Sequence, residues 1–172
     1  MRALALLAVL PLAASCGDDP VENKAAAVVA APSPGQWELT SQVTRFTQAD
    51  HGRPKIDTPV GTRATQSVCV AAGQQLPAAL FAGDNLTCSY SAYYVRNGIA
   101  NATLNCRREG LNGDIAMNSS GHFQADSIDL HRSIRTILQG DGDVLIESDV
   151  TGRRTGATCT PAPAGPAGQN KQ

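Results

Sequence analysis

Alternation of apolar and polar residues in the middle of the chain limits it to a sheet with one buried face. Across residues 113–138 most apolar side chains have odd numbers before a turn-forming break at residues 124–127 and even numbers after it. Successive side chains of a strand point to opposite faces, so this period predicts two half-buried strands. A turn at the break places Phe123 opposite Ile128 and so sets apolar against apolar.

The same period recurs on both sides of this hairpin. It is found in residues 35–46, 62–70, 87–108 and 143–154. Only residues 71–83 have apolar side chains at helical spacing, and Pro77 stands where the first turn of a helix tolerates it. The sequence therefore predicts a mostly β fold, an antiparallel meander of about seven strands forming a curved sheet or incomplete barrel, with one short helix.

The N-terminus has the pattern of an export signal. Arg2 precedes an apolar run that is too short to cross a bilayer. The run ends in Ala-Ala-Ser before Cys16, which resembles the lipobox of bacterial lipoproteins. That resemblance implies removal of residues 1–15, a diacylglycerol on the sulfur of Cys16 and acylation of the new amino group. The alternative is an ordinary signal peptide, which would leave Cys16 as a spare thiol.

The composition of the termini sets the expected boundaries of the folded unit. Residues 16–33 follow the signal with charges, alanines and prolines, which is typical of a flexible tether behind a lipidated cysteine. Residues 160–172 are rich in Pro and Gly and are expected to be a disordered tail. The β-rich domain is then 34–159. Gly17 after the cysteine favours, by resemblance to envelope lipoproteins, the periplasmic face of the outer membrane.

Number parity predicts the first disulfide. The residues on one face of the strands in 87–108 all have even numbers, from Cys88 to Tyr94 and from Ala100 to Cys106. A three-residue loop at residues 96–98 would pair even with even, so that Tyr94 faces Ala100 and Cys88 faces Cys106. Directly opposed cysteines in an exported protein are expected to be oxidised.

The second disulfide follows by elimination. With Cys16 lipidated, only Cys69 and Cys159 remain. Their bond would join the second strand to the end of the last strand. The chain-entropy model assigns it more stabilisation than the first disulfide, because it closes a longer loop.

Several short motifs together resemble one protein family. They are "PGQWELT" at residues 34–40, Val68-Cys69, the pair Cys88 and Cys106, "GHFQADSIDL" at residues 121–130, and "GRRTGATC" at residues 152–159. In this order they resemble the domain of unknown function 3617 family (DUF3617). The resemblance implies an envelope location and a β-rich fold, and it implies no activity.

Candidate catalytic and metal-binding residues are few. The predicted register sets His122 opposite Asp129 with His131 on the same side, but no close-spaced ligand motif joins them to His51. We interpret the histidines as solvated and expect no metal and no cofactor. Ser120 precedes His122 without the G-x-S-x-G elbow of a serine hydrolase.

Charged residues give no clear partner. The chain has 14 basic and 15 acidic residues, which gives no excess of charge for nucleic acid. Six arginines fall on neighbouring predicted strands: Arg107, Arg108, Arg132, Arg135, Arg153 and Arg154. They form either a basic patch facing anionic lipid or ordinary cross-strand ion pairs, and the second interpretation is the simpler one. Asp141 and Asp143 lack the further ligands of a calcium loop and indicate a solvated turn.

These features predict a non-enzymatic envelope lipoprotein. Its domain would bind a hydrophobic small molecule such as a lipid, or an envelope protein, and its anchor would bind the membrane. The alternative is an envelope hydrolase acting on peptidoglycan or lipid. An apolar mouth in the curved sheet would favour binding, whereas a cleft joining a histidine to an acid and a serine would favour hydrolysis.

Overall fold

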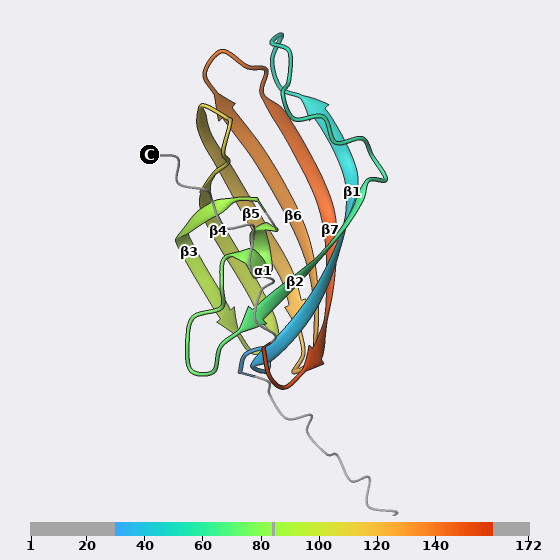
Figure 1. The fold of residues 1–172 in the computed structure, drawn as a ribbon, viewed down its shortest axis with the longest axis vertical. Coiled ribbons are helices and arrows are strands. Elements are labelled where there is room, and N and C mark those ends of the chain that lie inside the picture. Colours follow the sequence, from blue (N-terminus) through green and yellow to red (C-terminus); the bar gives the residue numbers. More distant parts are fainter. Residues whose placement is uncertain (1–29, 84, 160–172) are drawn as a thin grey trace, which may run out of the picture.

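In the part of the chain that the structure describes, seven antiparallel strands form one open sheet that curves around a single short helix (Figure 1). The computed structural model describes residues 30–83 and 85–159. The strands are β1 (Gly35–Gln48), β2 (Arg63–Val70), β3 (Thr87–Arg96), β4 (Ile99–Arg107), β5 (Gly113–Phe123), β6 (Ser127–Leu138) and β7 (Val144–Gly156), and the helix is α1 (Ala79–Ala82). The predicted fold class is thereby confirmed. The predicted signal 1–15, Cys16 and the tail 160–172 lie outside the described residues, as does the tether before residue 30.

The order of strands across the sheet is β2-β1-β7-β6-β5-β4-β3. Strands β3 to β7 follow one another as a meander, and the β1–β2 hairpin joins this meander at β7. Both edge strands, β2 and β3, therefore come from the first part of the domain. No described helix is long and apolar enough to cross a membrane.

The β5–β6 hairpin has the predicted register. Phe123 pairs with Ile128, Met117 with Ile134, and His122 with Asp129. Phe123, Met117 and Ile128 are buried, because the turn keeps the apolar positions of both strands on one face.

The β3–β4 hairpin corrects one prediction. Its turn has two residues, Asn97 and Gly98, both with positive φ (54° and 77°), which is the backbone of a type I′ turn. Tyr94 therefore pairs with Asn101 and not with Ala100. A register shift between Tyr90 and Ala92 inserts one extra residue into β3. This bulge restores the even parity, so Cys88 still faces Cys106.

The segment around α1 fills the space between the two edge strands. The helix is shorter than its predicted segment and has only four residues, with Leu80, Phe81 and Ala82 buried. From β2, Gln66 Nε2 donates to the carbonyl oxygen of Ala79 at 2.8 Å. From β3, the hydroxyl of Tyr90 donates to the carbonyl oxygen of Leu76 at 2.8 Å. The two edges of the sheet are thus connected through this segment instead of through a strand pair.

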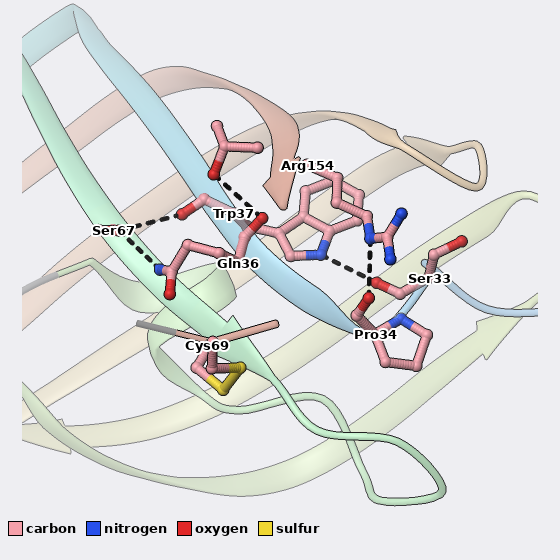
Figure 2. The surroundings of a disulfide bond; sticks show 9 residues. Ser33, Pro34, Gln36, Trp37, Ser67, Cys69 and Arg154 are labelled. Carbon is pink, nitrogen blue, oxygen red and sulfur yellow. Dashed lines mark hydrogen bonds between the residues drawn. A yellow bond between two sulfur atoms is a disulfide. The ribbon is translucent and has the colours of Figure 1, made fainter. Parts of the chain in front are cut away.

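Two disulfides reinforce the sheet, and both join the predicted partners. Cys88 and Cys106 link β3 to β4 with a Cα–Cα distance of 4.0 Å. Cys69 on β2 is bonded to Cys159 beyond β7 with a Cα–Cα distance of 5.3 Å (Figure 2). Near it, Trp37 Nε1 donates to the Ser33 carbonyl oxygen at 3.0 Å (Figure 2). The second disulfide therefore lies where the segment leading into β1 is also held.

Candidate functional site: a cavity on the concave face

The concave face of the sheet contains a cavity of about 390 Å³. It lies beside the end of α1, under the middle of β1, β6 and β7, and the loop before β2 contributes to its wall. Its volume is within the range of about 300–1,000 Å³ that is usual for small-molecule sites. The predicted incomplete barrel therefore has an interior space.

The wall of the cavity is mainly apolar because two hydrophobic clusters meet there. The larger cluster packs around Trp37 and Phe81, and the smaller one joins Val43, Ile56 and Ile146. Ile134 packs against both. The apolar side chains lining the cavity include Leu39, Val43, Ile115, Ile134, Ile146 and Val150. The gap between the two clusters thus forms the apolar part of the site.

Arg132 is the polar centre of the cavity, which corrects its assignment to a surface group of arginines. Its side chain lines the cavity, and the residue is only 8% exposed. It occupies the same face of β6 as the buried Leu130 and Thr136. The alternation of β6 therefore sends this guanidinium into the domain.

Two hydrogen bonds hold the Arg132 guanidinium. Nε donates to Ser148 Oγ on β7 at 3.1 Å, and Nη1 donates to the carbonyl oxygen of Ala82 at 2.9 Å. The last carbonyls of a helix have no partner within the helix, so Ala82 is a natural acceptor at the end of α1. Gly83 follows with φ 91°, and a Cβ there would lie 3.0 Å from Nη1. The turn after α1 is shaped closely around the guanidinium.

The charge of Arg132 is not balanced by any carboxylate among residues 30–83 and 85–159. No described Asp or Glu lies within 4.0 Å of it, and none lines the cavity. Burial lowers the pKa of its guanidinium from the usual value, and an arginine nevertheless keeps its charge at neutral pH. A guanidinium has five N–H donors, and the described residues accept from two of them. Three donors are left.

A row of polar side chains crosses the apolar face at Arg132. Strand pairing sets Ser119 on one side of it and Ser148 on the other. Ser119 is 1% exposed, and its Oγ has no hydrogen-bond partner in the described part of the chain. Leaving such a hydroxyl without a hydrogen bond lowers the stability of a fold by about 1–3 kcal/mol. Packing alone therefore does not explain this row of polar side chains.

The remaining arginines lie at the surface or in ion pairs. Arg107 Nε is 3.3 Å from Asp114 Oδ1 on the next strand, and Arg154 Nη1 is 3.3 Å from Asp126 Oδ1. Arg108 is exposed and also lines the cavity. Arg135 and Arg153 are exposed as well. Of the six arginines named in the sequence, Arg107 and Arg154 thus form ion pairs of the kind that was expected.

The histidines lie on the outer face of the sheet or in an exposed loop. His131 Nδ1 is 3.1 Å from Asp149 Oδ1, and strand pairing places Ser120 on the other side of His131. No hydrogen bond joins Ser120 to His131 within the described chain, and His131 and Asp149 are both more than half exposed. The described residues contain no group of His, Cys, Asp or Glu that could hold a metal ion.

His122 and Asp129 line a second cavity of about 540 Å³, which lies on the opposite face of the sheet. Its other walls include Glu38, Thr151 and Arg153, so it is polar and carries both signs of charge.

The two aspartates of the β6–β7 loop have structural partners. Asp143 Oδ1 accepts hydrogen bonds from Thr136 Oγ1 at 3.0 Å and from the Leu138 amide at 2.8 Å. Asp141 forms an ion pair with Lys55 at 2.9 Å. Both aspartates therefore have partners within the protein, whereas the sequence predicts a solvated turn.

Comparison with known proteins decides the family. A family model described as "Protein of unknown function (DUF3617)" matches residues 32–159. The chain belongs to the DUF3617 family. No curated protein and no solved structure matches it. The matched part of this DUF3617 chain contains both disulfides and every described residue that lines the concave cavity.

The site residue that sequence reasoning missed in this DUF3617 domain is Arg132. The signal was present, because Arg132 has the same parity as Leu130 and Ile134 on a strand whose register was predicted. A charged residue on the apolar face of a one-sided sheet is rare unless it is paired.

Proposed function

We propose that this DUF3617 protein is a non-enzymatic lipoprotein of the bacterial envelope whose domain binds a hydrophobic small molecule in the concave cavity. The observation that carries the proposal is the cavity of about 390 Å³ at the junction of two apolar clusters. An apolar ligand would remove this apolar wall from water, and that burial is favourable.

The anchor is the second part of the proposal. Cys16 is expected to carry the lipid, and the protein would face the periplasm from the outer membrane. Replacing Cys16→Ser should release the protein from the membrane without unfolding the domain, since residues 16–33 separate the two. Equal partition of variant and wild type into a detergent phase would contradict this, and density-gradient fractionation of the envelope would identify the membrane.

Native mass spectrometry of the full chain, purified from its own envelope, tests the binding function. The wild type should retain a small molecule. Ser41→Phe, which fills the cavity from β1, should lose that molecule. Thr40→Phe is the matched control, because Thr40 lines the cavity of the opposite face. A protein partner in place of a small molecule, no retained mass at all, or equal retention by both variants would overturn the proposal.

A hydrolase acting on peptidoglycan or lipid is the second candidate. The observation in its favour is the His131–Asp149 contact with Ser120 in the neighbouring position. Neither of the two larger cavities is lined by Ser120, His131 or Asp149. These three side chains therefore lack the enclosed site from which a hydrolase excludes water. Turnover of envelope lipid or peptidoglycan by the wild type and its loss in Ser120→Ala would establish this function.

A further inference from the structure

We propose that the ligand of the concave cavity is a fatty carboxylate whose head group pairs with Arg132. This inference rests on the proposed binding function and specifies its ligand class. The structure supports it through three observations: the charge of the cavity, the free donors of one guanidinium, and the apolar wall around them.

The charge of the cavity calls for an anion. Its described lining has two cations, the buried Arg132 and the exposed Arg108, and no acidic residue. Taking a charge out of water without a partner of opposite sign is costly, and an anion that enters the cavity would remove that cost. The complementary ligand is therefore negatively charged at one end.

The donors of Arg132 favour a carboxylate head group. After the bonds to Ser148 and Ala82, three N–H groups of the guanidinium have no acceptor among the described residues. A guanidinium presents its donors as a planar fork that matches the two oxygens of a carboxylate. A carboxylate is balanced by the buried Arg132 alone, whereas a phosphate monoester carries about −1.5 to −2 at pH 7 and would leave its second charge to the exposed Arg108.

The rest of the ligand should be an aliphatic chain. Six branched apolar side chains of the strands line the cavity: Leu39, Val43, Ile115, Ile134, Ile146 and Val150. They come from β1, β5, β6 and β7 and lie on the same concave face as Arg132. An aliphatic chain can follow this wall while its head group stays at the guanidinium.

The bonds of Arg132 also give it a structural role, since they join β6 to the end of α1. The test therefore needs a measurement that this role does not affect. Preference between two ligands that differ only in the head group is such a measurement, because loss of the α1 contact would weaken both equally.

The experiment compares dodecanoate with dodecan-1-ol at equal concentration, using the full chain in a non-ionic detergent and native mass spectrometry. The wild type should retain dodecanoate about 10- to 100-fold better, as expected for hydrogen bonds to a charged group. Arg132→Met should keep the binding of the alcohol and lose the preference. Arg132→Lys should keep part of the preference. Arg135→Met is the matched control on the exposed face of β6 and should behave as the wild type.

The outcomes separate this inference from the proposed function. If the wild type retained neither dodecanoate nor dodecan-1-ol, both the carboxylate inference and the proposed binding function would be overturned. Equal retention of both compounds, unchanged in Arg132→Met, would overturn the carboxylate alone and leave the binding function. Stronger retention of dodecyl phosphate than of dodecanoate would replace the carboxylate by a phosphate.

Discussion

The guanidinium of Arg132 donates to the carbonyl oxygen of Ala82 at 2.9 Å and so joins the middle of the sheet to the end of α1. Gly83, the next residue, has φ 91° and ψ 178°, a conformation that is almost restricted to glycine. We expect Gly83→Ala to lower the free energy of unfolding by about 1–3 kcal/mol.

Gly73→Ala is its control in urea unfolding. Gly73 also has positive φ, but a Cβ there would meet no atom within 4 Å, so its cost should be limited to about 1 kcal/mol of backbone strain. Equal costs for both substitutions would contradict a tight turn around Arg132.

Tyr90 anchors the segment before α1 to β3. Its hydroxyl donates to the carbonyl oxygen of the buried Leu76 at 2.8 Å. Tyr90→Phe should therefore lower the free energy of unfolding by about 1–2 kcal/mol, since that carbonyl loses its partner. Tyr94→Phe is the control, because Tyr94 is 49% exposed, and it should change stability by less than about 0.5 kcal/mol.

Alkaline pH should destabilise the domain through the same tyrosine. Burial, and to a lesser extent the neighbouring Tyr93, raises the pKa of the Tyr90 hydroxyl. The unfolded chain then releases this proton at a lower pH than the folded chain does, so stability falls as the pH rises above about 10. Tyr90→Phe should reduce this slope in urea unfolding measured between pH 9 and about 11. The same slope in both proteins would argue against a shifted Tyr90.

The β3–β4 turn can be distinguished from the three-residue loop that parity suggested. In the type I′ turn Asn97 has φ 54°, so Asn97→Ala should cost about 1 kcal/mol. Asn97→Gly should be tolerated, since glycine accepts positive φ without strain. In a three-residue loop, alanine and glycine would be accepted about equally at this position, and that result in thermal unfolding would contradict the two-residue turn.

The two disulfides should differ in their effect on stability. They close loops with sequence separations of 90 for Cys69–Cys159 and 18 for Cys88–Cys106. The chain-entropy model gives upper estimates of about 4.6 and about 3.2 kcal/mol. Replacing Cys69 and Cys159 together by alanine should therefore cost more than the same change at Cys88 and Cys106.

Urea unfolding measures these two costs, and non-reducing peptide mapping checks the pairing itself. A peptide joining Cys69 to Cys88 would contradict both the bonds and the register of β3 with β4. Greater destabilisation from loss of the short-loop disulfide would show that the entropy of loop closure does not decide which disulfide stabilises the domain more.

Local pattern determined which residues share a face in β5 and β6, whereas the bulge in β3 turns Tyr94 away from the face that was predicted for it. In the β5–β6 hairpin, period-two alternation and one polar break were sufficient to predict that Phe123 pairs with Ile128. The reason is local, since a shift of one residue would turn every apolar side chain of a strand to the solvent. The same rule placed Cys88 opposite Cys106, which is correct. It assigned one residue too many to the loop, because the structure has that residue as a bulge between Tyr90 and Ala92.

Spacing along the sequence was sufficient to predict the strands, the family motifs and the pair Cys88–Cys106. The pair Cys69–Cys159 then followed by elimination. The pairing of β1 with β7 and the cavity depend on contacts between segments that are distant in the sequence. The cavity is the space left between side chains from five strands, α1 and the neighbouring loops, and its size depends on how far the sheet curves. The cost of burying Arg132 likewise depends on which groups from other segments surround it. No spacing within one segment encodes those distances.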